Sequence, residues 1–361
     1  MIGRWFAAVL MLLLAVGPVL GAPPPGQLSR LSRGINITGW FRYPASTDPA
    51  VLSRWLSDTA IVDLRQAGFS FVRLAFDPAI LAAAPVRTVF LEQIRRLQSH
   101  GLAVIVSPHP VTWRIDTNSA DRARFIAFWS TFAPALRTLP PALTFPEVLN
   151  EPVFHDEPAS WWRLQHDLLV SIRVALPGHT VVLTGHDWGG ITGLLTLPPE
   201  MDKNVMYSFH FYEPAELTSL AAWRPELDRN ALARLPFPGG SPTDCERTAG
   251  GADPPTAGII RFYCAMNRDA GPVRARIQSA AVWARRHGVA LLAGEFGATS
   301  ALNGPSRLAW LRLVRETCAE NSIPWALWGY DDVMGFDVKR PPVFKPVLDQ
   351  SVKVALDLQG P

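Results

Sequence analysis

Short apolar runs alternate with longer amphipathic segments from Gly34 onward. The runs are mostly continuous stretches of Val, Ile, Leu, Ala and Phe, which is typical of parallel strands covered on both faces. They predict eight strands, at Gly34–Thr38, Phe69–Leu74, Ala103–Ser107, Phe145–Leu149, Thr180–Leu183, Val205–His210, Ala290–Ala293 and Pro324–Trp328. The segments between them predict helices, among them Thr88–His100, Asp121–Leu136, Ser160–Ala175, Pro272–His287 and Ser306–Asn321. Gly68, Gly101 and Gly288 each separate a predicted helix from the next strand, a position where glycine commonly ends a helix.

Eight strand-then-helix units predict an α/β protein, a (β/α)8 (TIM) barrel formed as a single domain. A doubly wound open sheet is the alternative. Such a sheet usually has a Gly-rich phosphate turn after an early strand, whereas the first strand here continues into Thr38-Gly39-Trp40-Phe41, without a GxGxxG motif. The segment Pro236–Asn267, rich in Gly, Pro and Asp, is interpreted as an insertion after strand six.

Residues 1–22 have the features of a secretory signal peptide, and a Pro-rich lead-in, 23–31, separates them from the predicted domain at 32–361. Arg4 supplies a positive charge, and the apolar run Ala7–Val16 is shorter than the roughly 20 residues of a membrane span. We expect cleavage and a secreted or periplasmic protein without stable membrane insertion. An uncleaved N-terminal anchor is the alternative, because Leu20 stands where cleavage after Ala22 would require a small residue.

Composition narrows the class of protein. With 34 Lys plus Arg, 31 Asp plus Glu and 48% hydrophobic residues, the chain is neither disordered nor strongly basic, so we expect no nucleic-acid partner. The near-neutral charge and the absence of a coiled-coil pattern favour a monomer. Three cysteines exclude a disulfide-dense scaffold and a four-Cys zinc site. Because an exported chain permits disulfides, we expect Cys245 and Cys264 to close the insertion, and Cys318, in a helical segment, to be a buried thiol.

Polar and aromatic residues occur where the apolar strands end, which is the active-site face of such a barrel. The strand-end residues are Arg73, His109, Asn150, Glu151, His210, Tyr212, Glu295 and Trp328. A polar side chain at the end of an apolar strand must be hydrogen-bonded or solvated. Trp40, Trp113 and Trp188 lie in predicted strand-to-helix loops, where they either stack on a ligand or pack against the protein.

Glu151 and Glu295 follow strands four and seven, whose ends face each other across the barrel mouth. Two carboxyl groups about 5 Å apart suit retaining glycoside hydrolysis, in which one acts as nucleophile and the other as acid and then base. The nucleophile must be ionised and the acid must hold a proton, so the two need different surroundings.

The sequence resembles glycoside hydrolase family 5, the cellulases and mannanases among the retaining barrels, over most of its length. The resemblance rests on the strand-end residues above and on three motifs, RGINITGW at 33–40, VLNEP at 148–152 and GEFG at 294–297. It implies that Glu151 is the general acid/base, that Glu295 is the nucleophile, and that Asn150 binds the substrate 2-hydroxyl.

The same resemblance implies roles for the other strand-end residues. Arg73 and Tyr212 would keep the nucleophile ionised and oriented, and His210 would lie near the acid/base. His109 would line the subsite on the non-reducing side of the cleaved bond. Trp328 would form an apolar platform under the sugar, because a pyranose has an apolar face of C–H groups. Trp40 and Trp188 are further candidates for sugar stacking.

The predicted function is therefore a secreted endo-β-1,4-glucanase that acts on soluble or amorphous β-glucan without a metal or another cofactor, with a polysaccharide or oligosaccharide as its partner. β-Mannanase, β-1,3-glucanase and short-substrate β-glucosidase are the alternatives within the family. A metal-dependent barrel hydrolase would need a His-x-His pair at the first strand, where this chain has Asn36 and Thr38. A non-catalytic carbohydrate-binding protein is disfavoured because both glutamates are present.

Overall fold

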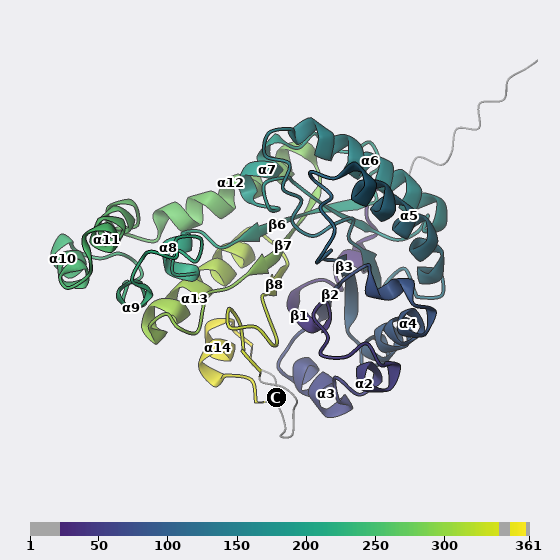
Figure 1. Cartoon of the computed structure of the whole chain (residues 1–361), viewed down its shortest axis with the longest axis horizontal. Coiled ribbons are helices and arrows are strands. Elements are labelled where there is room, and N and C mark those ends of the chain that lie inside the picture. Colours follow the sequence, from purple (N-terminus) through teal and green to yellow (C-terminus); the bar gives the residue numbers. More distant parts are fainter. Residues whose placement is uncertain (1–21, 339–346, 359–361) are drawn as a thin grey trace, which may run out of the picture.

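Eight parallel strands form a nearly closed barrel surrounded by helices in the computed structural model (Figure 1), which describes residues 22–338 and 347–358. All but the last residue of the predicted signal segment lie outside the described residues. The strands are β1 (Arg33–Phe41), β2 (Phe71–Phe76), β3 (Ala103–Pro108), β4 (Thr144–Pro146), β5 (Val181–Thr184), β6 (Val205–Phe211), β7 (Ala290–Phe296) and β8 (Trp325–Leu327). Their order is β4-β3-β2-β1-β8-β7-β6-β5. An isolated bridge between Glu147, which directly follows β4, and Val182 of β5 links the two outer strands.

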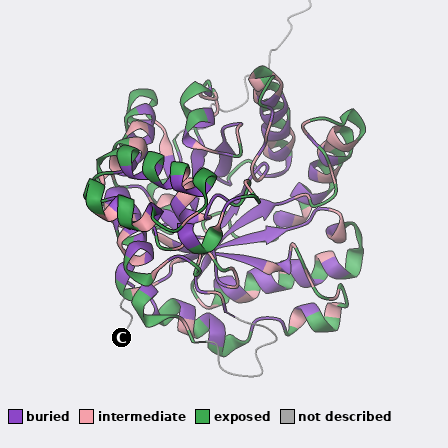
Figure 2. Ribbon diagram, turned by 60° about the vertical axis from the view of Figure 1, so that its left-hand side comes forward, coloured by how far each residue is buried: buried purple, intermediate pink, exposed green. Residues whose placement is uncertain are grey.

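The helices lie outside this ring, with exposed outer faces and buried inner faces (Figure 2). They are α1 (Pro25–Leu28), α2 (Pro49–Ser53), α3 (Asp58–Gln66), the 3-10 helix η1 (Ile80–Ala82), α4 (Ala84–Ser99), α5 (Ser119–Leu136), α6 (Pro158–Ala175), α7 (Ile191–Thr196), α8 (Ala215–Thr218), α9 (Arg229–Leu232), α10 (Pro242–Ala249), α11 (Pro254–Met266), α12 (Gly271–His287), α13 (Gly304–Glu320) and α14 (Gln350–Ala355). The TIM-barrel prediction and all eight predicted strands are confirmed. Two strands extend beyond their predicted C-terminal ends: β1 ends at Phe41 and not at Thr38, and β2 ends at Phe76 and not at Leu74.

The ends of the helices follow from their sequences. Side chains of Ser57 and Asn118 accept hydrogen bonds from backbone N–H groups in the first turns of α3 and α5, groups that have no partner inside the helix. Gly288 ends α12 at φ 63°, a left-handed conformation that glycine adopts without a steric penalty.

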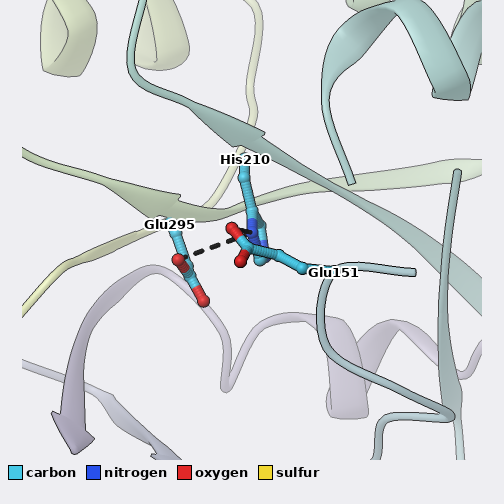
Figure 3. A group of neighbouring side chains, drawn as sticks. All are labelled: Glu151, His210 and Glu295. Carbon is cyan, nitrogen blue, oxygen red and sulfur yellow. Dashed lines mark hydrogen bonds and ion pairs between the residues drawn. The ribbon is translucent and has the colours of Figure 1, made fainter. Parts of the chain in front are cut away.

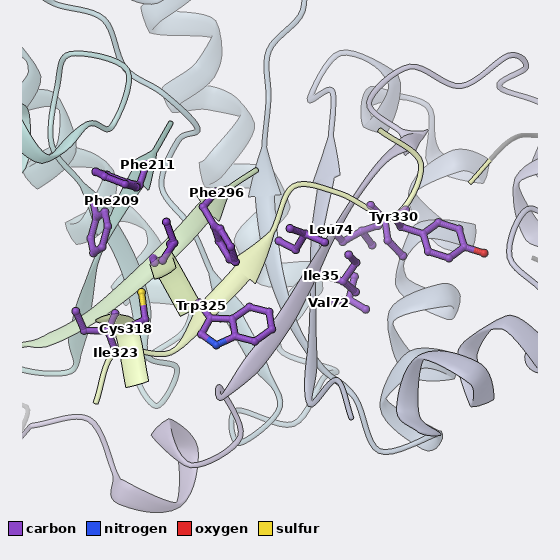
Figure 4. Packing of buried hydrophobic residues seen from close by; sticks show 14 of the residues in the cluster. Ile35, Val72, Leu74, Phe209, Phe211, Phe296, Cys318, Ile323, Trp325 and Tyr330 are labelled. Carbon is purple, nitrogen blue, oxygen red and sulfur yellow. The ribbon is translucent and has the colours of Figure 1, made fainter. Parts of the chain in front are cut away.

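The core has two parts, one inside the barrel and one between the barrel and the helices. The inner part is apolar in the half where the strands begin, and Phe71, Ile105, Phe145 and Met206 fill it. A Cβ on Gly34 would lie 2.2 Å from the Phe71 ring, so only glycine lets that ring enter the barrel. The outer part is larger, and Figure 4 shows a portion of it.

Polar side chains replace apolar ones two residues further along the inward-facing positions of several strands. Phe71 is followed by Arg73, Phe145 by Glu147, and Met206 by Ser208 and His210. Because side chains of a strand alternate between its faces, these polar groups all point into the same half of the barrel. The C-terminal half of the interior is therefore a polar layer resting on an apolar floor.

The predicted insertion lies between β6 and β7 and projects from the barrel as the helical hairpin α10–α11 (Figure 1, left). A disulfide joins Cys245 and Cys264, whose Cα atoms are 6.1 Å apart, and Cys318 is a buried free thiol. Within residues 22–338 and 347–358, no helix has the length and apolar character needed to cross a bilayer.

Both ends of the described chain lie at the face where the strands begin. Ala22 lines a cavity of about 740 Å³ together with Met206, Ala290 and Pro324, which lie at or next to the starts of β6, β7 and β8. At the other end of the chain, Asp357 forms an ion pair of 3.2 Å with Arg33, the first residue of β1.

Candidate active site

The guanidinium of Arg73 is the centre of the polar layer and is fully buried. It donates two hydrogen bonds to the carboxylate of Glu147, at 2.7 and 3.0 Å, and one to Glu295 Oε1 at 2.5 Å. It also donates to the side-chain oxygens of Asn36 and Asn150, at 2.9 and 2.8 Å. Burial acts to lower the pKa of Arg73, but the charges of both carboxylates outweigh it and raise that pKa, so the group stays a cation.

Sequence reasoning placed Arg73 at the end of strand two, which is wrong, because β2 continues for three more residues and Arg73 lies inside the barrel. Glu147 is not among the predicted strand-end residues. This carboxylate is the buried partner of Arg73, and it directly follows β4. The sequence indicated of Asn36 only that it stands where a metal-dependent hydrolase would need a histidine. In the structure its amide donates to the carbonyls of Gly294 and Leu327, each at 3.1 Å.

Two carboxylates and a histidine meet above this layer (Figure 3). The β6–β7 register pairs His210 with Glu295, and Nδ1 of His210 lies 3.4 Å from Glu295 Oε2 and 3.0 Å from Glu151 Oε1. The Tyr212 hydroxyl donates to Glu295 Oε2 at 2.9 Å. The nearest ligand atoms of Glu151, His210 and Glu295 all lie within 4.8 Å of one another.

The backbone of Glu151 is held in an unusual conformation. Its φ is +44°, in the left-handed region that residues other than glycine rarely adopt, and Pro152 follows it. The neighbouring Asn150 N–H donates to the carbonyl of Pro108 at 3.0 Å, which ties this turn to the end of β3. Such conformations cost about 1–3 kcal/mol and persist only where the surrounding structure holds them. The turn directs the Glu151 side chain toward His210.

The surroundings of the two carboxyl groups differ. The Glu295 side chain is 3% exposed and that of Glu151 is 32% exposed. Burial raises the pKa of Glu295, and His210, Arg73 and Tyr212 oppose that rise. Burial also acts to raise the pKa of Glu151, but the hydrogen bond and charge of His210 bring it below its ordinary value. The two carboxyls therefore compete for the same imidazole, and their titration belongs to the cluster as a whole.

The same three side chains offer ligand atoms close enough to hold a metal ion, and no other group of three or more His, Cys, Asp or Glu does so in the described ranges. However, Arg73 and Tyr212 already occupy both oxygens of Glu295. An arginine beside the carboxylate also disfavours a second cation.

His109 and Trp328 form one wall of the site. Their rings are nearly parallel, at 24°, with centroids 5.8 Å apart, and His109 Nε2 is hydrogen-bonded to Ser107 Oγ at 2.9 Å. Burial, together with the charges of Arg42, Arg73 and His210, lowers the pKa of His109 well below its usual value, so the ring is neutral. Arg42 was missed by sequence reasoning. Its guanidinium lies 5.6 Å from the Trp328 ring centroid, and it directly follows the true end of β1.

Two tryptophans were proposed to stack on sugars, and for Trp40 this prediction is wrong. It lies within β1 and is fully buried, with its ring centroid 5.2 Å from that of Trp55. Its indole N–H donates to the Leu52 carbonyl at 2.9 Å, so Trp40 belongs to the core. Trp188 is 53% exposed. Its backbone N–H donates to the carbonyl of Pro152, the residue after Glu151, which places its loop beside the carboxylates.

Comparison with known proteins shows the family. The model of the family described as Cellulase (glycosyl hydrolase family 5) matches residues 36–333. The chain is a member of glycosyl hydrolase family 5. This confirms the resemblance and shows that the chain is a glycoside hydrolase, since the match covers the barrel from β1 to β8.

Individual relatives of this family 5 chain are distant. Endoglucanase 3 of Fibrobacter succinogenes is 26% identical over 83% of the chain, and the chain spans about half (49%) of that protein. Endoglucanase C of Acetivibrio thermocellus is 22% identical, with 89% of this chain and 96% of that protein covered. The structure of Thermotoga maritima Cel5A in complex with mannotriose superposes with a TM-score of 0.72 at 24% identity, covering 92% of this chain and 100% of that one. At this identity the superposition shows the fold.

Proposed function

We propose that this family 5 chain is a retaining endo-β-1,4-glycanase that acts on soluble or amorphous β-glucan, with Glu295 as nucleophile and Glu151 as acid/base. The observation that carries the proposal is the closeness of the two carboxylates, whose nearest oxygens lie within 4.8 Å. Retaining enzymes hold their carboxyls about 5–5.5 Å apart, whereas inverting enzymes leave about 6.5–9.5 Å for a water molecule.

The hydrogen-bond donors around each carboxylate support this division of roles. Glu295 accepts from Arg73 and from Tyr212, so both oxygens are oriented and a permanent cation favours the anionic, nucleophilic form. Burial and the charges of Glu295 and Glu151 raise the pKa of Tyr212 well above its usual value, so its hydroxyl remains a donor. Attack by Glu295 on the anomeric carbon forms the glycosyl-enzyme while the bond to the leaving oxygen breaks.

Glu151 would supply the proton that the leaving oxygen needs. It is the more exposed carboxyl, no arginine of the described residues forms an ion pair with it, and Nδ1 of His210 contacts it at 3.0 Å. A neutral His210 with Nδ1 unprotonated accepts a hydrogen bond from protonated Glu151, whereas a protonated Nδ1 favours the carboxylate. We infer that Glu151 holds the proton for the leaving oxygen when the substrate is bound. Once the glycosyl-enzyme has formed, Glu151 takes a proton from the incoming water, whose oxygen bonds to the anomeric carbon while the bond from that carbon to Glu295 breaks.

The substrate class is supported by the relatives and by Trp328. Two relatives are named endoglucanases, which favours a glucan. β-Mannan is the second candidate, because Cel5A was solved with mannotriose. The half-buried indole of Trp328, stacked on neutral His109, is a suitable platform for the apolar face of either sugar. Asn150, held by Arg73 at 2.8 Å, would bind the 2-hydroxyl.

The domain assignment and the cellular location belong to the same proposal. We assign catalysis to residues 32–361 and propose that residues 1–22 direct secretion or transport to the periplasm and are then removed. N-terminal sequencing of the mature protein tests the cleavage, and an N-terminus at Met1 in the exported protein would refute it.

The test of function is the release of reducing ends under identical conditions from five substrates. They are cello-oligosaccharides, carboxymethyl-cellulose, glucomannan, laminarin and mixed-linkage β-glucan. We expect activity on the β-1,4-glucans, with loss in Glu295→Ala. Proton NMR of the first product should show the β-anomer. An α-anomer would refute the retaining mechanism. Activity on glucomannan or laminarin alone would refute the assignment of β-1,4-glucan as the substrate.

A further inference from the structure

A second cavity, of about 420 Å³, adjoins Glu151 and lies between two connections at the C-terminal face of the barrel. Pro110 and Trp113–Thr117, from the β3–α5 connection, form one wall, and Leu149–Phe154, which follow β4, form the other. Its volume lies within the roughly 300–1,000 Å³ of pockets that hold small ligands. We call it the side pocket. Glu295 and Trp328 are not among its lining residues.

The walls of the side pocket are held in place by α5. Arg122 donates to the carbonyls of Ile115 and Asp116, at 3.2 and 3.1 Å, and the Arg114 N–H donates to the Asp121 carboxylate at 2.9 Å. Arg124 lies over the Trp113 ring at 5.6 Å from its centroid. A wall fixed in this way is preformed, so a ligand does not have to order it.

The chemistry of the pocket suits a sugar. The Trp113 indole lines it, and the buried side chains of Ile115, Leu149 and Phe154 add apolar surface. The guanidinium of Arg114 and the carboxylate of Asp116 make no side-chain hydrogen bond to any described residue. A sugar hydroxyl both donates and accepts, so an acidic and a basic group beside an aromatic ring match its needs.

The position of the pocket indicates which sugar would enter it. It adjoins the proposed acid, which acts on the leaving oxygen, and it is separate from the nucleophile and from the Trp328 platform. Because Glu295 and Trp328 mark the proposed course of the main chain and neither lines the pocket, the pocket offers space beside that course. We infer that the side pocket binds a single-sugar branch carried by the leaving-group side of the main chain, so that the enzyme accepts branched β-1,4-glycans. This inference rests on the proposed function.

The test compares cello-oligosaccharides with xylose-branched oligosaccharides of the same backbone length. We expect the wild-type enzyme to cleave both, and to release from the branched chain a product whose new non-reducing end is a branched glucose. In Trp113→Ala and Asp116→Asn, the ratio of kcat/KM for branched over linear chains should fall about tenfold. Trp223→Ala, which removes a 57% exposed tryptophan outside the side pocket, is the matched control and should keep the wild-type ratio.

The outcomes separate the two proposals. Cleavage of linear chains together with rejection of branched ones would overturn the side pocket and leave the proposed function standing. An unchanged ratio in both variants, or cleavage that occurs only before unbranched glucose, would also overturn it. Failure on linear and branched chains alike would refute the proposed function itself. Thermal unfolding of each variant shows whether a lower rate reflects a loss of folded protein.

Discussion

Replacement of Arg73 by methionine should destabilise the fold as well as abolish turnover. Methionine fills much of the same volume without charge. The change leaves Glu147 and Glu295 in the barrel interior, where their side chains are 0% and 3% exposed, without the cation that both contact. It also removes the donor to Asn36 and Asn150.

The size of the effect follows from burial. Removing one partner of a buried ion pair costs about 3–5 kcal/mol, because the remaining charge is left uncompensated. Here two carboxylates lose the same partner, so we expect a loss near the upper end, about 5 kcal/mol at pH 7. Without Arg73 the folded variant binds more protons on these carboxyls than the unfolded chain does, so lowering the pH favours the folded state. The deficit relative to wild type should therefore shrink as the pH is lowered from 7 to 5.

Urea unfolding at pH 7 and pH 5, followed by tryptophan fluorescence, measures this deficit. The double variant Arg73→Met/Glu147→Leu removes one stranded charge and should regain part of the lost free energy. A deficit below about 1 kcal/mol at pH 7, or one that grows in acid, would refute the reasoning that Arg73 holds the barrel interior together by charge.

Three further predictions concern separate parts of the molecule. Glu151→Ala should keep much of its first-step rate on aryl glycosides with good leaving groups while losing polysaccharide cleavage, and equal losses on both would contradict its role as acid. Burial lowers the pKa of His179 to about 4, so the unfolding free energy should fall by at most about 3 kcal/mol as the pH drops from 6.5 to 4, and His179→Leu should flatten that slope in urea titrations. Cys245→Ser/Cys264→Ser should lower stability by about 3 kcal/mol and expose α10–α11 to proteolysis, and an unchanged melting temperature would count against this.

Much of the fold could be predicted from local pattern. The apolar runs located all eight strands, because a parallel strand covered on both faces is apolar along its whole length. Strand ends then indicated Glu151, His210, Tyr212 and Glu295, which do lie together. Here chain order and barrel topology were sufficient, since the C-terminal ends of all strands meet at one face.

What failed depended on contacts between distant segments. Trp40 was misplaced because its environment is set by Trp55 and by the carbonyl of Leu52, and nothing in the local sequence shows that α2 and the residues after it cover β1. Glu147 could not be interpreted without Arg73, which lies 74 residues earlier in the chain. The side pocket needs two loops at once, so no single segment indicates it.

The positions of Ala22 and Asp357 have a practical consequence. Ala22 and Asp357 both lie at the face where the strands begin, and the carboxylates lie at the opposite face. A bead, a carrier domain or an affinity tag joined next to Ala22 or Asp357 would hold the enzyme with its cleft turned toward the medium, where a long polymer can approach without meeting the support. The polarity of a parallel barrel thus separates the point of attachment from the point of cutting, and immobilised enzyme should turn over polymer and short oligosaccharide in the same ratio as free enzyme.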